Sequence, residues 1–145
     1  MSILVYVDHL QGTARQISWE IMGKARELAG KLGQPVAALV VGSQVGNLAQ
    51  EAIAYGADRV LVAEDAAFDQ FRTLAYAAAL KAAIAEAGAE IILCSHSMGV
   101  SDMAAYAAAD LGMGVAVDCQ DLSLDAEGNL QAVRPVYSGN ILTTI

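Results

Sequence analysis

Four short polar segments of this sequence contain the residue types that do chemistry in α/β proteins. Each directly follows an apolar run, and they are Asp8-His9, Gly42-Ser43, Glu64-Asp65 and Ser95-His96-Ser97. In an open α/β sheet, ligands bind at the carboxyl ends of the strands, where the strand order reverses. These segments are therefore the candidate positions for a nucleophile, an acid–base group, a metal ion or a phosphate.

Catalytic and metal chemistry have little support in these segments. Ser95-His96-Ser97 places hydroxyls beside an imidazole, but adjacent residues of a strand end point in opposite directions, and no GxSxG nucleophile elbow occurs. His9 and His96 are the only histidines, and no His or Cys pair has the tight spacing of a zinc site. We expect structural or loop-lining histidines, no catalytic residues and no metal. The acids are expected to be solvated charges and helix caps, namely Glu64, Asp65, Asp69 and Asp102.

The glycine-containing segment at residues 42–46 is the candidate phosphate loop. It lacks the GxGxxG spacing and has no following lysine, which excludes both the dinucleotide fingerprint and the P-loop. Small residues and backbone N–H groups before a helix leave two interpretations open, a weak anion receptor or a plain strand-to-helix turn. After the fourth apolar run, Gly99 is not followed by the spaced glycines, ending in Gly-Ser or Gly-Thr, of stress-protein-like adenine-binding domains. Self-contained ATP binding is not expected.

The elements that must position these residues alternate between apolar runs and helical patterns. The apolar runs predict strands at 3–7, 36–41, 59–63, 90–94 and 115–117, and the 3.6-residue patterns predict helices at 17–32 (capped by Thr13), 46–55, 71–87 and 102–111 (capped by Ser101). Strands that are apolar on both faces and separated by helices indicate a parallel sheet covered on both sides, an α/β doubly wound sandwich. The alternating runs 122–124 and 130–136, with a turn at 125–129, predict an antiparallel C-terminal hairpin at the sheet edge.

Composition narrows the class of protein and of partner. With 145 residues, 1–145 is expected to be a single α/β domain. Thirteen of the sixteen acidic residues, but only four of the eight basic ones, follow residue 35, and the net charge is −8, which disfavours nucleic acid and anionic membranes. The longest uncharged run, 32–50, is interrupted by glycines, proline and amides, so no membrane insertion is expected. Two cysteines in apolar runs and no secretory signal predict reduced thiols in a cytoplasmic protein.

The most distinctive segment is Arg134-Pro135-x-Tyr137-x-Gly139-Asn140. Together with four other segments, in this order and spacing, it resembles the N-terminal domain of the electron transfer flavoprotein alpha subunit. The other segments are "ILVYVDH", "GADRVLVAED", "EIILCSHS" and "AADLGMGVAVDCQDL". The resemblance covers essentially the whole chain.

This resemblance implies a component of a heterodimeric electron carrier. Such proteins accept electrons from acyl-CoA and related dehydrogenases, as in fatty acid oxidation, on a non-covalent FAD and pass them to an acceptor. FAD is held mainly by a C-terminal alpha domain that has no counterpart here, so the chain ends where that domain would follow and no cofactor is expected to bind tightly to this chain alone. The domain would be scaffold and subunit interface, not an enzyme.

The resemblance also suggests where partners bind. We expect Arg134, Tyr137, Gly139 and Asn140 to belong to a contact with the beta subunit or the flavin domain; the simpler alternative is an ordinary edge hairpin with an exposed arginine. A homodimer of the isolated domain is left open. The alternative function is a stand-alone nucleotide- or small-molecule-binding module of the stress-protein type, dimeric through its edge strands, whereas a small hydrolase lacks the necessary motifs.

Overall fold

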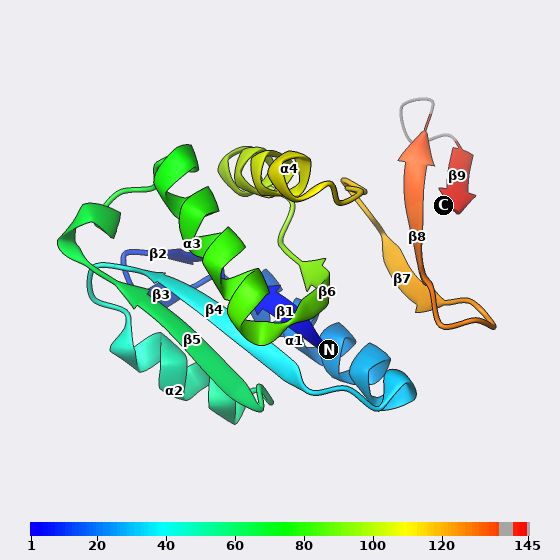
Figure 1. The fold of residues 1–145 in the computed structure, drawn as a ribbon, viewed down its shortest axis with the longest axis horizontal. Helices are drawn as coiled ribbons and strands as arrows, with labels where there is room; N and C mark the ends of the chain where they lie inside the picture. Colours follow the sequence, from blue (N-terminus) through cyan, green and yellow to red (C-terminus); the bar gives the residue numbers. More distant parts are fainter. Residues whose placement is uncertain (137–140, 145) are drawn as a thin grey trace.

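The computed structural model describes residues 1–136 and 141–144, and its centre is a parallel sheet with helices on both faces (Figure 1). The sheet has four strands in the order β5-β4-β1-β6. They are β1 (Ser2–Tyr6), β4 (Val36–Gly42), β5 (Arg59–Glu64) and β6 (Ala89–Leu93). The predicted α/β class, with a parallel sheet and antiparallel C-terminal strands, is confirmed.

Two apolar layers hold the helices on this sheet. On one face, α1 (Gln16–Leu32) and α2 (Gly46–Ala54) pack against Ile3 and Val5 of β1 and against Val7, which follows the strand. On the other face, α3 (Thr73–Ala87) and α4 (Met98–Leu111) pack against Leu4 and Tyr6. Every residue of β1 and β4 is buried, which explains why these strands read as continuous apolar runs rather than alternating ones.

The strand order reverses at β1. The chain moves outward from β1 to β4 and β5, and then returns to place β6 on the other side of β1. The carboxyl ends of β1 and β6 therefore flank the topological switch point, which is where open α/β sheets bind ligands. Asp8-His9 and Ser95-His96 follow these two strands.

The predicted fifth strand at 115–117 is wrong. Residues 113–117 form no strand, and β6 remains the edge strand of the parallel sheet in the part of the chain that the structure describes. The apolar run has strand propensity, but Gly114 precedes it and Asp118 follows it in a left-handed conformation with φ 53°. Three residues between such positions are too few for propensity alone to secure pairing.

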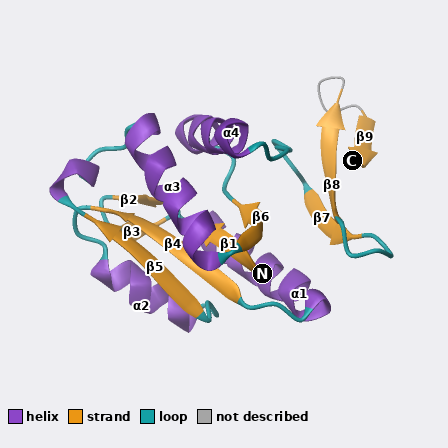
Figure 2. Cartoon of the chain, viewed as in Figure 1, coloured by secondary structure: helices purple, strands orange, loops and turns teal. Residues whose placement is uncertain are grey.

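The antiparallel strands form a sheet of their own rather than extending the parallel one (Figure 2). They are β7 (Asp121–Leu124), β8 (Leu130–Val136) and β9 (Ile141–Thr144), in the order β7-β8-β9. The predicted turn between the first two is confirmed: Asp125 Oδ1 accepts hydrogen bonds from the N–H groups of Glu127 (2.9 Å) and Asn129 (2.8 Å). Leu122 and Leu124 pack this sheet against the core beside α1.

Some predicted element boundaries were wrong. Thr13 does not cap α1, because it lies in a small hairpin of β2 (His9–Leu10) and β3 (Thr13–Ala14). The helix α4 begins at Met98, not Asp102, and its N-cap is Ser97, whose Oγ accepts from the Val100 N–H at 3.4 Å. A 3₁₀ turn, Ala66–Phe68, precedes α3. No helix of the described residues is both long enough and apolar enough to cross a membrane.

Candidate functional site

A buried aspartate joins the ends of β1 and β6 at the switch point. Ser95 Oγ donates to Asp8 Oδ2 at 3.1 Å, and Arg15 Nε lies 3.3 Å from the same oxygen. Ser18 Oγ accepts from the Asp8 N–H at 2.9 Å and bonds the Asp8 carbonyl at 3.0 Å. Asp8 and Ser95 are only 8% and 5% exposed, so the charge needs these partners, and it has them.

The carboxylate of Asp8 also affects the pKa of two neighbouring groups on the face of the sheet that α3 and α4 cover. Burial, and then the negative charge of Asp8, raises the pKa of the Cys94 thiol to about 12. The same two causes raise the pKa of the Tyr6 hydroxyl. Cys94 therefore stays a neutral thiol at physiological pH, and a thiol nucleophile is not available at this position.

His9 is a structural residue that links the ends of two strands. The Gly12 N–H donates to His9 Nδ1 at 3.1 Å, so the proton is on Nε2, which donates to the Val41 carbonyl at 2.6 Å. The imidazole lies so close to Gly42 that a Cβ added there would be 3.1 Å from the ring and 2.4 Å from Val45 Cγ1. Gly42 is thus required by packing rather than by a phosphate.

The segment 42–46 is a strand-to-helix turn that already holds an internal anion. Glu64, the last residue of β5, accepts from the Val45 N–H through Oε2 at 2.8 Å. This carboxylate takes the position at the start of α2 where an external anion would otherwise be attracted. Of the two interpretations left open by the sequence, the turn describes the structure, and Glu64 is one of its structural parts.

The three residues of Ser95-His96-Ser97 point to different partners. Ser95 bonds Asp8, Ser97 caps α4, and the exposed His96 lies with its Nδ1 3.3 Å from Ser101 Oγ. Within residues 1–136 and 141–144, no carboxylate is hydrogen-bonded to His96 to orient it as a general base. The same residues contain no group of three or more His, Cys, Asp or Glu side chains that could hold a metal ion.

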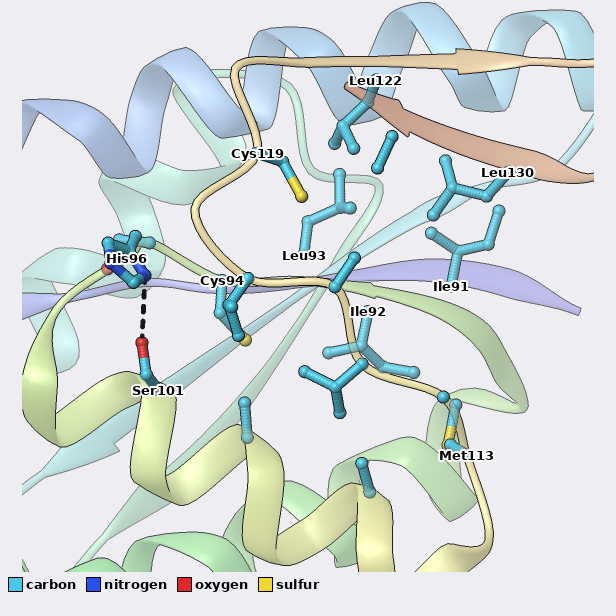
Figure 3. Close-up of a pocket in the computed structure, with 18 of the residues that line it drawn as sticks. Ile91, Ile92, Leu93, Cys94, His96, Ser101, Met113, Cys119, Leu122 and Leu130 are labelled. Carbon is cyan, nitrogen blue, oxygen red and sulfur yellow. Dashed lines mark hydrogen bonds between the residues drawn. The ribbon is translucent and has the colours of Figure 1, made fainter. Parts of the chain in front are cut away.

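A cavity of about 550 Å³ lies beyond β6, a feature that the sequence did not reveal (Figure 3). Its walls come from β6, α1, α3, α4, the linker 113–119 and the β7–β8 hairpin. Figure 3 shows Ile92 and Cys94 on the α4 side of β6, with Cys119 at the far end of the linker from Met113. Burial raises the pKa of the Cys119 thiol, and the nearby Arg134 guanidinium partly offsets this.

Arg134 is the one predicted interface residue that the structure describes. It lies in β8 opposite Thr143 and is half-buried, and its Nε is buried with no hydrogen-bond partner in the described part of the chain. The other three predicted residues, Tyr137, Gly139 and Asn140, lie outside the described residues. Arg134 thus differs from the exposed arginine of an ordinary edge hairpin, and the contact itself stays a prediction.

The Asp8 network was also missed by the sequence interpretation. Its signal was present, because Asp8 directly follows a fully apolar strand, where a carboxylate becomes buried unless it turns outward. Of its two partners, Arg15 is close to Asp8 in the sequence, whereas Ser95 is far from it. The sequence therefore gave no means of predicting that both would contact Asp8. Only the order of the strands brings Ser95 to Asp8.

Known proteins are similar to this chain over almost its full length. Residues 3–145 match the model of the electron transfer flavoprotein domain. The chain is 36% identical to protein FixB of Azorhizobium caulinodans, and 34% identical to electron transfer flavoprotein subunit alpha of Thermoanaerobacterium thermosaccharolyticum. It is also 34% identical to subunit LctC of the lactate dehydrogenase (NAD(+),ferredoxin) of Acetobacterium woodii. Each match covers 99% of this chain but 40%, 43% and 34%, respectively, of those proteins.

Proposed function

Because this chain belongs to the electron transfer flavoprotein domain family, we propose that residues 1–145 form the N-terminal lobe of an alpha subunit and act as scaffold and subunit interface. One observation supports this role above others. At the switch point, where an α/β enzyme would hold its substrate, Asp8 is bonded by both Ser95 and Arg15. The polar groups there stabilise the lobe itself, so the chemistry belongs to other parts of the assembly.

FAD is the cofactor that the family implies for the whole protein. The turn at the start of α2 does not fit its diphosphate, because the Val45 N–H is already bonded to Glu64 at 2.8 Å. The flavin is therefore proposed to lie in the remainder of the alpha subunit, and no step of electron transfer is assigned to residues of this lobe.

We propose the electron donor and the electron acceptor only as classes of protein. A dehydrogenase, either for acyl-CoA or for another substrate, would reduce the flavin of the assembly, and the flavin would reduce an acceptor in the cytoplasm. The relative LctC is a subunit of a lactate dehydrogenase, which supports a hydroxy acid as a second substrate class for the donor. In either case this lobe would be part of a carrier rather than a catalyst.

The beta subunit is the proposed partner, and Arg134 with Tyr137, Gly139 and Asn140 is the proposed contact. Arg134 is half-buried, so part of its side chain remains exposed, and guanidinium groups are favoured as donors in interface ion pairs and hydrogen bonds.

Arg134→Ala tests this contact against Arg59→Ala, which removes a surface ion pair with Glu86 (3.0 Å) on the far edge of the sheet. Binding of the beta subunit would be measured by isothermal titration calorimetry. We expect Arg134→Ala to weaken binding by at least about tenfold, which is 1.4 kcal/mol, and Arg59→Ala to leave it unchanged. Equal affinities of the two variants would remove Arg134 from the interface.

A further inference from the structure

The outer edge of β6 carries backbone groups that no strand pairs. In the part of the chain that the structure describes, β6 pairs only with β1, and no backbone hydrogen bond joins it to the linker 113–119. In an extended strand, the N–H and C=O of one residue point to the same side. Alternate residues of β6 therefore present a donor beside an acceptor toward the cavity of about 550 Å³.

The cavity has the size and lining of a small-molecule site. Such sites typically measure roughly 300–1,000 Å³ and are mainly apolar with a few polar groups. Ile91 and Leu93 contribute on the face of the sheet that α1 covers, and Ile92 contributes on the face that α4 covers. A ligand that forms hydrogen bonds with these backbone groups removes an unfavourable state, because unpaired polar groups in apolar surroundings cost free energy.

The shape favours a flat ligand. The lining side chains of α4 are all short, namely Ser101, Ala104, Ala107 and Ala108, whereas Leu80 and Ile84 of α3 also line the cavity. A flat ring can therefore lie against α4. The linker lies opposite, with Val115 48% and Val117 37% exposed, so a ring inserted beside it would cover apolar surface. Figure 3 shows the linker passing along β6, with Ile92 and Cys94 between the strand and α4.

The charges that line the cavity do not favour an anionic ligand. No lysine or arginine is among the described residues that line it, whereas Glu90 and Asp118 are. His96 and Ser101 lie at one end, 3.3 Å apart, and supply polar groups without a fixed positive charge. Arg134 is close enough to Cys119 to lower its pKa but is not among the lining residues, so a phosphate or carboxylate in the cavity would face Glu90 and Asp118 without a basic side chain to bind it. A nucleotide does not suit this cavity.

We propose that the cavity binds a small, neutral, flat heteroaromatic molecule that carries a hydrogen-bond donor next to an acceptor on one edge of its ring. That edge pairs with the free backbone of β6, and the ring lies between the alanines of α4 and the linker. Gly112 and Asp118 hold left-handed conformations, with φ 67° and 53°, at either end of the linker, where the chain turns to cover the ring. This site is independent of the proposed interface role.

Quinazolin-4(3H)-one is a suitable probe, because its ring N–H is adjacent to its carbonyl. Titrated into the ¹⁵N-labelled chain, it is expected to give saturable shifts in the amide resonances of residues 91–95 and 113–119. The matched control is 3-methylquinazolin-4-one, which keeps the ring and removes the donor. We expect it to bind at least about tenfold more weakly, because one backbone carbonyl is then left unpaired. Equal affinities, no saturable shift, or shifts confined to other residues would overturn the proposal.

A pair of adjacent substitutions locates the site. Ala104→Leu fills the alanine wall, whereas Ala105→Leu adds the same atoms to an exposed position one residue further along α4. Binding of quinazolin-4(3H)-one is expected to be lost in the first variant and kept in the second. Binding that survives in a folded Ala104→Leu protein would contradict the proposed position. If that variant does not fold by circular dichroism, the comparison of the two probes still decides the question.

Discussion

Asp8 acts as a structural charge at the point where α/β proteins often bind substrates. Its carboxylate is held by Ser95 and Arg15, at 3.1 and 3.3 Å, and its backbone is held by Ser18. A buried charge with such partners fixes the relative positions of β1, β6 and the segment before α1. The same charge contributes to the raised pKa of Cys94, so one residue both orders the strand ends and keeps a nearby thiol unreactive.

The raised pKa of the Cys94 thiol leads us to expect a loss of folding stability in alkaline solution. Its pKa rises from an ordinary 9.0 to about 12 on folding, so the folded state holds the proton more tightly than the unfolded state. The stability due to this difference is complete below pH 9 and is lost as the pH rises toward 12. Where only the unfolded thiol is ionised, the free energy of unfolding should fall by about 1.4 kcal/mol per pH unit.

Urea unfolding between about pH 8 and about pH 10, below the range in which Tyr6 would contribute strongly, measures this slope. Cys94→Ala should lower stability at neutral pH, because it removes buried atoms, but should flatten the fall above pH 9. A slope that is unchanged in Cys94→Ala would assign the alkaline loss to other groups.

Replacing glycine by alanine is expected to have opposite effects on stability at Gly42 and at Gly30. Gly42→Ala would place a Cβ 2.4 Å from Val45 Cγ1 and 3.1 Å from the His9 ring, so we expect destabilisation by about 1–3 kcal/mol. Gly30→Ala, in α1, meets nothing within 4 Å and should stabilise the protein by about 0.5–1 kcal/mol. Both values come from chemical unfolding, and a neutral Gly42→Ala would contradict the close packing of His9 on this turn.

At the scale of elements, the pattern of apolar residues was sufficient for the parallel sheet. The strands 3–7, 36–41, 59–63 and 90–94 were recognisable as apolar runs because helices cover both faces of the sheet, although only the two central strands are buried at every position. The run at 115–117 has the same appearance but does not pair, because pairing depends on whether the linker reaches β6. The start of α4 was placed too late, because Ser97 and Ser101 are equally good caps by sequence and only the structure shows which one bonds the backbone.

The docking of the antiparallel sheet on the α1 side yields a third prediction. Leu124 packs into the core that contains α1, whereas Leu142 of β9 is 59% exposed. We expect Leu124→Ala to lower the free energy of unfolding by about 1–2 kcal/mol, less than for a fully buried leucine, and Leu142→Ala to change it by less than about 0.5 kcal/mol.

Differential scanning calorimetry of the two leucine variants would show whether the two sheets unfold together. A single transition that shifts downward in Leu124→Ala is expected. A Leu124→Ala protein as stable as Leu142→Ala would mean that the antiparallel sheet does not depend on the α1 side of the core for support.

At the scale of the whole molecule, the resemblance found in the sequence is confirmed by the family match over residues 3–145. The chain spans roughly two fifths of the length of its FixB and alpha-subunit relatives. Sequence reasoning reached the family because several segments occur together in order. It could not reach the Asp8 network or the cavity, since both depend on which strands become neighbours.

This lobe is proposed to work within a flavoprotein and not alone. The most direct measurement is sedimentation velocity of the chain mixed with the beta subunit and the flavin-binding part of the alpha subunit, followed by flavin absorbance. We expect the chain to sediment with the flavin in one complex, and to bind neither flavin nor ATP tightly by itself. A chain that sediments separately from the flavin and binds ATP tightly on its own would contradict the account.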